Sequence, residues 1–134
     1  IFKAMEGDLT FHGRQPRKTL LKILPQAAFS IFFRKTTRTN LAGFPSKLAE
    51  SISYGTPTIT NPMPSSSQFM IEGRIGHLID PLDPDHAAEK IVKIFDQSDA
   101  EINAMKAYCY SSDIFHYRSF IRSTFKWLSN LHNR

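Results

Sequence analysis

Apolar and polar residues follow one another along the chain with two spacings, and these spacings predict strands and helices in turn. A period of two, or a short run of β-branched and aromatic residues, favours a strand. Apolar residues three and four apart favour a helix. The expected strands span residues 9–12, 28–33, 58–60 and 77–80. The expected helices span residues 16–24, 46–54, 65–72, 84–95, 98–108 and 114–131.

This order of strands and helices predicts an α/β fold. Right-handed crossovers then place the strands in one parallel, Rossmann-like sheet with helices on both faces. Ligands of such sheets bind beyond the carboxyl ends of the strands, at the loops that lead into helices. The loops at 13–15, 34–43 and 61–65 all leave strand ends, and the helix that begins at Ser46 opens on the same edge. We therefore expect a ligand site at this edge.

The sequence of residues 43–60 predicts a glycine-containing loop, a short amphipathic helix, a glycine that ends this helix, and the start of a strand. Leu48, Ala49 and Ile52 share one face of the helix, which predicts that this face is buried. Gly55 suits the position just after a helix end, where the backbone often turns left-handed. The pattern predicts a helix that is held to the sheet by its apolar face and presents its polar face to the edge.

The polar face of that helix carries Ser46, Lys47 and Glu50. A helix start has unpaired N–H groups and the positive end of the helix dipole, so an anion would dock at Ser46 and Lys47. Glu50, one turn farther along, could accept hydrogen bonds from a hydroxyl of the same ligand. Phosphate beside a sugar hydroxyl describes a nucleotide diphosphate or a nucleotide sugar. A surface helix without a ligand would carry the same residues.

Capping residues mark two later helix starts. Ser65, with Gln68 three residues on, indicates a capping box. Asp83 suits an N-cap, with Pro84 at the first helical position. The buried stripe of this second helix is expected to comprise Ala88, Ile91, Val92 and Phe95.

The last expected helix separates an apolar side from a basic side. Arg118, Arg122 and Lys126 recur on the basic side at steps of four residues. The apolar side comprises Tyr117, Phe120, Ile121, Phe125, Leu128 and Leu131. The basic side is either a solvated face or a contact for anionic lipid.

Composition limits the class of protein. The chain has 134 residues, of which 41% are apolar and 22% charged, as expected for one globular domain. Its sequence contains no apolar run of the ~18 residues that cross a membrane. The formal net charge of +5 permits a phosphorylated ligand, nucleic acid or anionic lipid as partner. Because the chain begins at Ile1 without an initiator methionine or signal pattern, we expect it to be part of a longer protein.

The chemistry-bearing residues favour binding over reaction. The single cysteine, Cys109, excludes an intrachain disulfide and a cysteine metal cluster, which favours a cytoplasmic protein. Cys109 itself is expected to be a buried or half-buried small hydrophobe. The five histidines show no metal-ligand spacing, so no metal is expected. The sequence has no nucleophile elbow and no evident acid–base pair of carboxylates, which leaves the catalytic residues unassigned.

Three motifs follow one another in a specific order. Gly43-Phe44-Pro45-Ser46-Lys47, followed by Glu50, is similar to a GFP(S/T)K…E signature. Gly55-Thr56-Pro57-Thr58-Ile59 is similar to a G-(T/V)-P-V-(I/V) strand entry, and Gly76 to Pro81 to a G-x-L-(V/I)-x-P turn. With these motifs the chain resembles, from about residue 9 to 83, the C-terminal half of GT-B glycosyltransferases of the retaining family 4 (glycosyl transferases group 1).

The resemblance implies a site for a nucleotide-diphosphate sugar, the donor substrate. Glu50 matches the acid that holds the ribose hydroxyls. Backbone groups of the glycine loop and the helix start would face the donor, and Lys47 or Arg34 would balance the diphosphate charge. Gly13 and Arg14 would lie beside the nucleobase. The full set is Gly13, Arg14, Arg34, Gly43, Phe44, Pro45, Ser46, Lys47, Leu48 and Glu50.

One position departs from the pattern of the family. The first acid of its E-x7-E motif would fall at Ala42, which leaves the contacts to the transferred sugar unpredicted. The resemblance implies that basic groups and a helix dipole stabilise the departing diphosphate, without an obligatory metal or other cofactor. Residues 1–134 would be one C-terminal donor domain. Its helices from about 98 to 131 would pack at its edge and reach an absent N-terminal domain that carries the acceptor site.

The expected function is therefore donor binding in a cytoplasmic glycosyltransferase that transfers a sugar to a glycan, lipid or other acceptor. We expect the isolated chain to be inactive, a peripheral contact with the inner face of an anionic membrane, and no nucleic-acid partner. Two alternatives stay open: half of a sugar-nucleotide epimerase, and a basic non-enzymatic module for nucleic acid or anionic membrane. The basic module would bind in a salt-dependent manner and ignore nucleotide diphosphates.

Overall fold

The computed structural model describes residues 10–132 of the chain. Within this range, β1 (Ser30–Ile31), β2 (Thr58–Thr60) and β3 (Gly76–Leu78) form a parallel sheet in the order β1-β2-β3. The helices are α1 (Arg17–Ile23), α2 (Arg38–Ala42), α3 (Ser46–Ser53), α4 (Pro84–Phe95), α5 (Asp99–Ser111) and α6 (Arg118–His132), with short 3-10 helices η2 (Leu24–Gln26) and η3 (Ser67–Phe69). The predicted Rossmann-like α/β class is confirmed.

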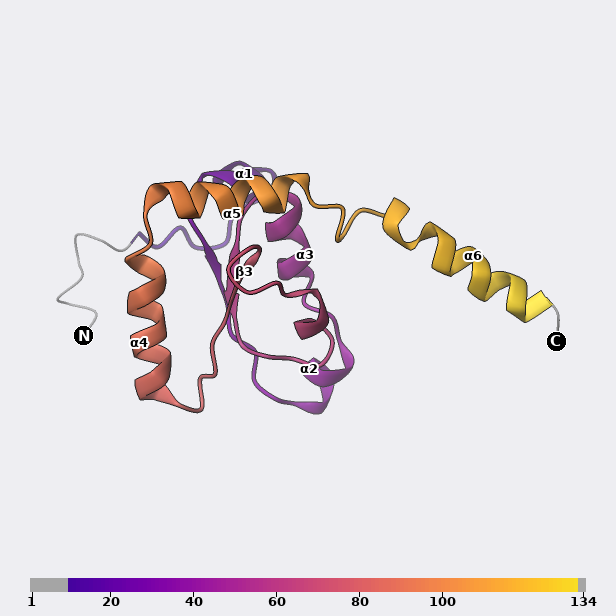
Figure 1. Cartoon of the computed structure of the whole chain (residues 1–134), viewed down its shortest axis with the longest axis horizontal. Coiled ribbons are helices and arrows are strands. Elements are labelled where there is room, and N and C mark those ends of the chain that lie inside the picture. The colour runs from indigo at the N-terminus through magenta and orange to yellow at the C-terminus, as the bar shows by residue number, and fades with distance from the viewer. Residues whose placement is uncertain (1–9, 133–134) are drawn as a thin grey trace.

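Helices cover both faces of the sheet. In Figure 1 the strands run between α4 and α3, and α5 crosses one end of the sheet. The apolar cluster on the α4 side contains Ile59, Ile79, Ala87 and Ile94. The cluster that joins α3 to α5 contains Leu48, Ile52, Ile75 and Cys109. Two separate clusters, one for each face, are what a fully covered parallel sheet requires.

The pairing of β2 with β3 depends on a close approach of the two backbones. Thr58 pairs with Gly76, whose φ is +142°. A Cβ atom at this position would overlap the backbone oxygen of Thr58. Glycine is therefore the residue that this register allows.

Helix α3 forms as the sequence predicts. Leu48 and Ile52 on its apolar face are 0% and 1% exposed. Tyr54 caps the helix and Gly55 follows with φ +74°, which confirms the predicted glycine stop. Burial of the Leu48 and Ile52 side chains contributes about 1.5–3 kcal/mol each to the stability of the fold. Packing, rather than helix propensity, therefore stabilises so short a helix.

Of the two strands expected nearest the N-terminus, the first does not form over its described residues and the second is shorter than predicted. Leu9 lies outside the described residues, and residues 10–12 form no strand because no neighbouring strand pairs with them; Phe11 is 85% exposed. The buried strand expected at 28–33 is reduced to β1. Since β1 is an edge strand, Ile31 and Phe33 stay 51% and 45% exposed.

Helix α4 begins as predicted but turns a different face to the sheet. The Asp83 side chain accepts the N–H of His86, and Pro84 is the first helical residue. The predicted buried stripe was wrong: Val92 and Phe95 are 59% and 55% exposed and Ala88 is exposed, whereas Ile91 is half-buried. The residues that face the sheet are Ala87, Ile91 and Ile94. Both stripes have helical spacing, and only packing on the sheet selects one of them.

Two other local predictions were wrong. Ser65 forms no capping box with Gln68; its hydroxyl donates instead to the carbonyl of Gly43 at 2.9 Å. The loop expected at 34–43 contains the short helix α2, which the side chain of Thr37 caps. The Ser65 hydroxyl thus binds a loop distant in sequence, whereas Thr37 forms a local cap by accepting the N–H of Asn40.

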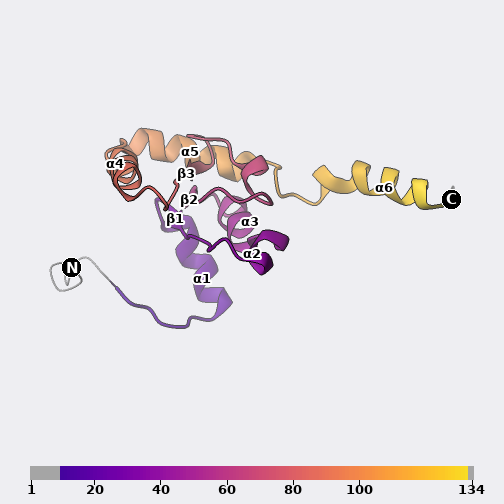
Figure 2. The ribbon, with the colours of Figure 1, turned by 90° about the horizontal axis from the view of Figure 1, so that it is seen from below.

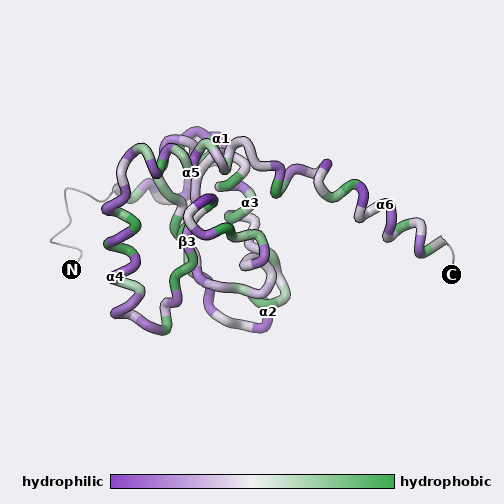
Figure 3. Tube along the Cα trace, in the orientation of Figure 1, coloured by the Kyte–Doolittle hydropathy of each residue, from purple (hydrophilic) through white to green (hydrophobic). Residues whose placement is uncertain are grey.

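Helix α6 stands apart from the rest of the molecule. Figure 1 and the perpendicular view in Figure 2 both show it projecting beyond α5. Apolar and polar residues alternate along its length (Figure 3). Its apolar side is exposed: Phe125 is 65% and Leu128 49% accessible. Among residues 10–132, no helix has both the length and the hydropathy required to cross a bilayer.

Candidate functional site

The loops that follow β1 and β2 are joined by a reciprocal pair of hydrogen bonds at the carboxyl ends of the strands. Arg34 N–H donates to Asn61 Oδ1 at 2.8 Å, and Asn61 Nδ2 donates to the Arg34 carbonyl at 3.0 Å. Asn61 is 4% exposed, so both polar groups of its buried side chain are satisfied. The pair fixes the backbone from which the Arg34 side chain extends.

The Arg34 guanidinium binds neutral acceptors. Nη1 donates to the Gly43 carbonyl at 3.1 Å, and Nη2 donates to Asn40 Oδ1 at 2.8 Å. Among the described residues no carboxylate forms an ion pair with Arg34. The half-buried cation is therefore oriented without being neutralised, which leaves its charge available to an anionic ligand.

The start of α3 borders a cavity of about 240 Å³. Its lining includes two cations, Arg34 and Lys47, and no acidic side chain. Pro45 is the N-cap, and no side chain caps the helix there. The N–H groups of the first turn thus add their partial positive charge to that of the two side chains. The complete lining is Phe32, Phe33, Arg34, Phe44, Pro45, Ser46 and Lys47.

A second cavity, of about 260 Å³, contains Glu50 and shares Phe32 and Lys47 with the first. Glu50 Oε1 accepts a hydrogen bond from Arg17 Nη2 at 3.0 Å. The two side chains are 36% and 72% exposed, so water screens the pair, and it contributes about 0–1 kcal/mol. A ligand that offers better hydrogen bonds to Glu50 could displace Arg17 at small cost.

A third cavity, of about 710 Å³, lies at the carboxyl ends of all three strands and shares Phe33 and Arg34 with the first. Arg34 is the one lining residue that was predicted individually as a site residue, although the loops at 34–43 and 61–65 were expected at this edge. Asp80 was missed, although its place just after β3 at the carboxyl edge could have indicated it. The lining is Phe33, Arg34, Lys35, Thr36, Asn61, Pro62, Asp80, Pro81 and Leu82.

The structure brings most of the predicted site residues together, with three exceptions. Five of them line the first cavity, Glu50 lines the second, and the Gly43 carbonyl binds Arg34. The Leu48 side chain is buried and its N–H donates to Pro45, so it offers no free group to a ligand. Gly13 and Arg14 lie on an exposed segment and line none of the three cavities.

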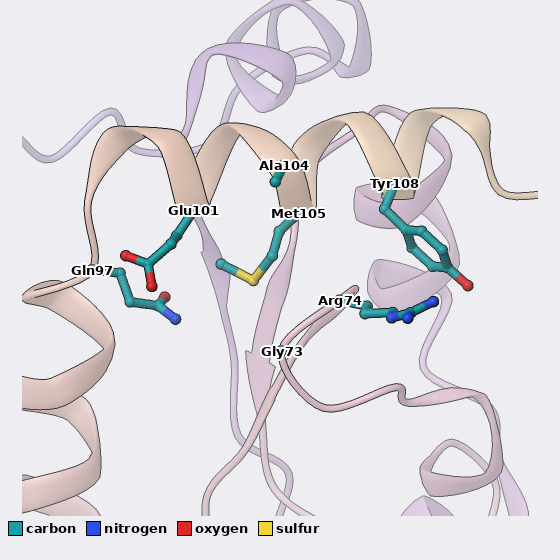
Figure 4. A pocket seen from close by; sticks show the side chains of 7 residues that line it. All are labelled: Gly73, Arg74, Gln97, Glu101, Ala104, Met105 and Tyr108. Carbon is teal, nitrogen blue, oxygen red and sulfur yellow. The ribbon is translucent and has the colours of Figure 1, made fainter.

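Another hollow, of about 330 Å³, lies at the opposite end of the sheet between α5 and the turn before β3 (Figure 4). Its charged groups already have partners. The Arg74 guanidinium lies over the Tyr108 ring, 5.4 Å from its centroid, and Glu101 caps α5 through Ser98. Because the lining contains one cation and one carboxylate, this hollow has no net charge to attract an anion.

Cys109 is 1% exposed, and burial raises the pKa of its thiol to about 11. The thiol is therefore protonated at neutral pH and is not an activated nucleophile. The prediction of a buried small hydrophobe is confirmed.

A comparison with models of known protein families finds one match. The family model for glycosyl transferases group 1 matches residues 3–111, most of the chain and all elements from α1 to α5. Neither a curated protein nor a solved structure matches the chain. Because the family model covers well over half of its length, the chain belongs to the glycosyl transferases group 1 family.

Proposed function

We propose that this chain is the C-terminal, donor-binding domain of a GT-B glycosyltransferase of the retaining family 4. The observation that carries the proposal is the cavity at the start of α3, which combines Arg34, Lys47 and a helix N-terminus with no acidic lining residue. Such a site suits the diphosphate of a nucleotide sugar. Membership of a glycosyltransferase family supports the proposal that this sugar is the group transferred.

The proposed role of the chain in catalysis is to stabilise the leaving group. When the bond between the anomeric carbon and the diphosphate breaks, negative charge develops on the phosphate oxygens. Arg34 is already oriented by Gly43 and Asn40, so it can bind that charge with little reorganisation. Lys47 and the α3 N-terminus add to the effect, and the proposal assigns no role to a metal. The acceptor and the remaining catalytic groups belong to an N-terminal domain in this proposal.

Glu50 is the proposed partner of the ribose. It lies in the second cavity, next to the phosphate position, because Lys47 borders both cavities. A carboxylate can accept hydrogen bonds from both ribose hydroxyls. Binding would replace the exposed ion pair with Arg17, which is a weak competitor.

Thermal unfolding in the presence of UDP, GDP or ADP tests the proposal. One of these nucleotides is expected to raise the Tm, because a ligand that binds only the folded state stabilises it. Glu50→Ala and Lys47→Ala should each weaken the effect about tenfold in concentration, the size expected for a hydrogen bond to a charged group. Lys126→Ala in α6 removes the same charge as Lys47→Ala and should have no effect. Unchanged Tm with all three nucleotides at millimolar concentration would refute the proposal.

A second proposal concerns α6, which lies beyond the family match. The helix carries Arg118, Arg122 and Lys126 on one side, and no acidic residue occurs from Arg118 to His132. We propose that this basic side contacts an anionic membrane, while the apolar side packs against the N-terminal domain. A row of basic side chains is attracted to the negative charge of an anionic headgroup surface. Sedimentation with anionic vesicles tests this second proposal.

A further inference from the structure

The three cavities at the carboxyl edge form one continuous series. The cavity at the α3 start lies in the middle: it shares Phe32 and Lys47 with the Glu50 cavity, and Phe33 and Arg34 with the large cavity. A nucleotide sugar has the same order, because its diphosphate joins the ribose at one end to the transferred sugar at the other. If the diphosphate occupies the middle cavity and the ribose the Glu50 cavity, the sugar must enter the large cavity.

The large cavity has the size and the chemistry for a sugar. Its volume of about 710 Å³ lies within the range of roughly 300–1,000 Å³ that is common for small-molecule sites. Phe33 and Leu82, which are 45% and 88% exposed, provide apolar surface for the C–H groups of a ring. Thr36 and Asp80 provide polar groups for its hydroxyls.

Asp80 is the residue best suited to bind sugar hydroxyls. Its Oδ1 accepts the N–H of Leu82 at 2.9 Å, which holds the carboxylate in a turn and leaves Oδ2 for a ligand. Asp80 forms no ion pair with any described residue. Asn61 also lines the cavity, but both polar groups of its side chain already bind the backbone of Arg34. Asp80 is thus the one carboxylate that this cavity presents to a ligand.

We propose that the large cavity is the subsite for the transferred sugar and that Asp80 selects it by accepting hydrogen bonds from its hydroxyls. This inference rests on the proposed function, since it takes the diphosphate position as its reference. The expected ligand part is a hydroxylated sugar ring attached to a nucleoside diphosphate.

The test compares the affinity for a nucleotide with the affinity for its sugar conjugate. Dissociation constants for UDP, GDP, ADP, UDP-glucose, GDP-mannose and ADP-glucose are measured by calorimetry for the full chain and for Asp80→Asn. Asparagine keeps the size and the turn acceptor but removes the charge. For the nucleotide that binds, we expect Asp80→Asn to lower the affinity for the sugar conjugate about tenfold. The affinity for the free nucleoside diphosphate should fall less than twofold. Asp96→Asn, at the exposed C-cap of α4 and outside the cavity, is the matched control.

The outcomes separate the two proposals. If the diphosphate binds but Asp80→Asn leaves the affinity for the conjugate unchanged, the sugar subsite is refuted and donor binding stands. If Asp80→Asn weakens the diphosphate and the conjugate equally, Asp80 does not act on the sugar and the subsite is again refuted. If no nucleotide and no conjugate binds to the unmodified chain, both proposals fail. Saturation-transfer NMR provides a second readout, because transfer to the sugar protons should fall in Asp80→Asn while transfer to the base protons persists.

Discussion

Helices α3 and α6 have the same kind of amphipathic sequence but different surroundings. On α3, Leu48 and Ile52 are almost inaccessible because the sheet and α5 cover them. On α6, Phe125 and Leu128 remain about half exposed or more, and both perpendicular views show the helix apart from the body. The period of a sequence therefore identifies the apolar side of a helix, but it does not identify what covers that side.

This difference matches the different functions that we propose for the two helices. The start of α3 borders two of the three cavities, and packing on the core holds Ser46 and Lys47 in place. Helix α6 has a basic side and an apolar side that no other described element fully covers. A binding site needs rigid support, whereas an exposed apolar side indicates a contact with another surface.

The largest expected effect is a loss of stability on truncating the buried face. Leu48→Ala removes a side chain that is 0% exposed, and we expect the free energy of unfolding to fall by about 2–5 kcal/mol. Leu128→Ala on α6 makes the same chemical change at an exposed position and should cost less than ~0.5 kcal/mol. Urea unfolding measures both. Equal losses would mean that α6 is covered by the body in solution.

Thiol reactivity compares the same two regions. Burial raises the pKa of Cys109 from 9.0 to about 11, which lowers its thiolate fraction at pH 8 about a hundredfold. Leu128→Cys in a Cys109→Ala background should react with iodoacetamide at least a hundredfold faster than Cys109 does in the folded chain. Mass spectrometry follows the labelling. Similar rates for the two thiols would contradict the burial difference.

Binding to lipid vesicles tests the proposed contact of α6 with an anionic membrane. The chain is expected to sediment with phosphatidylglycerol vesicles and not with phosphatidylcholine vesicles. Arg122→Ala should weaken binding by about 1 kcal/mol, or roughly fivefold. Lys93→Ala, an exposed change of the same charge on α4, is the control. Emission of Trp127, the only tryptophan, reports whether α6 contacts the lipid. Absence of sedimentation at low salt would refute the membrane proposal.

The smallest expected effect is the loss of folding stability at low pH that comes from Glu72, outside α6. Burial raises the pKa of Glu72, but hydrogen bonds from Lys90, the Leu78 N–H and His77 outweigh burial and hold the pKa below its ordinary value of 4.5. A lowered folded pKa stabilises the folded state above the unfolded pKa, and this contribution disappears as the pH falls below about 4.5. Because the Glu72 side chain is 49% exposed, we expect less than ~1 kcal/mol.

Urea unfolding of the unmodified chain and of Glu72→Gln at pH 7 and at pH 3.5 measures this contribution. The stability difference between the two proteins should shrink at the lower pH. A difference that stays constant between the two values would show that the Glu72 carboxylate adds nothing to folding. Helix α6 contains no acidic residue, so no corresponding acid effect is expected from it.

The parts of the fold that depend on short stretches of sequence were predictable. The start of α4 follows from Asp83 and Pro84, and the end of α3 from Gly55, because capping and left-handed turns are local. The buried side of α4 and the length of β1 were predicted wrongly. Both depend on how far neighbouring elements reach across the sheet, and that distance is not encoded within one segment.

The same division holds for the candidate site. The spacing of Ser46, Lys47 and Glu50 indicated an anion site with a hydroxyl acceptor one turn along. The approach of Arg34 to Asn61 and of Glu50 to Arg17 joins residues 27 and 33 positions apart, which no local pattern predicts. Asp80 was also not predicted as a site residue, because its position in a binding cavity depends on how the three strands lie together.

By itself, the sequence determined the α/β order, the polar and apolar sides of α3 and α6, and the residues at the start of α3, since each follows from spacing along one helix or turn. Only the tertiary structure decided that α3 is buried and α6 exposed. It also decided that Arg34 is oriented without being neutralised and that three cavities meet in one series. Burial and charge compensation are sums over neighbours from distant parts of the chain, so they exist only once those parts are packed together.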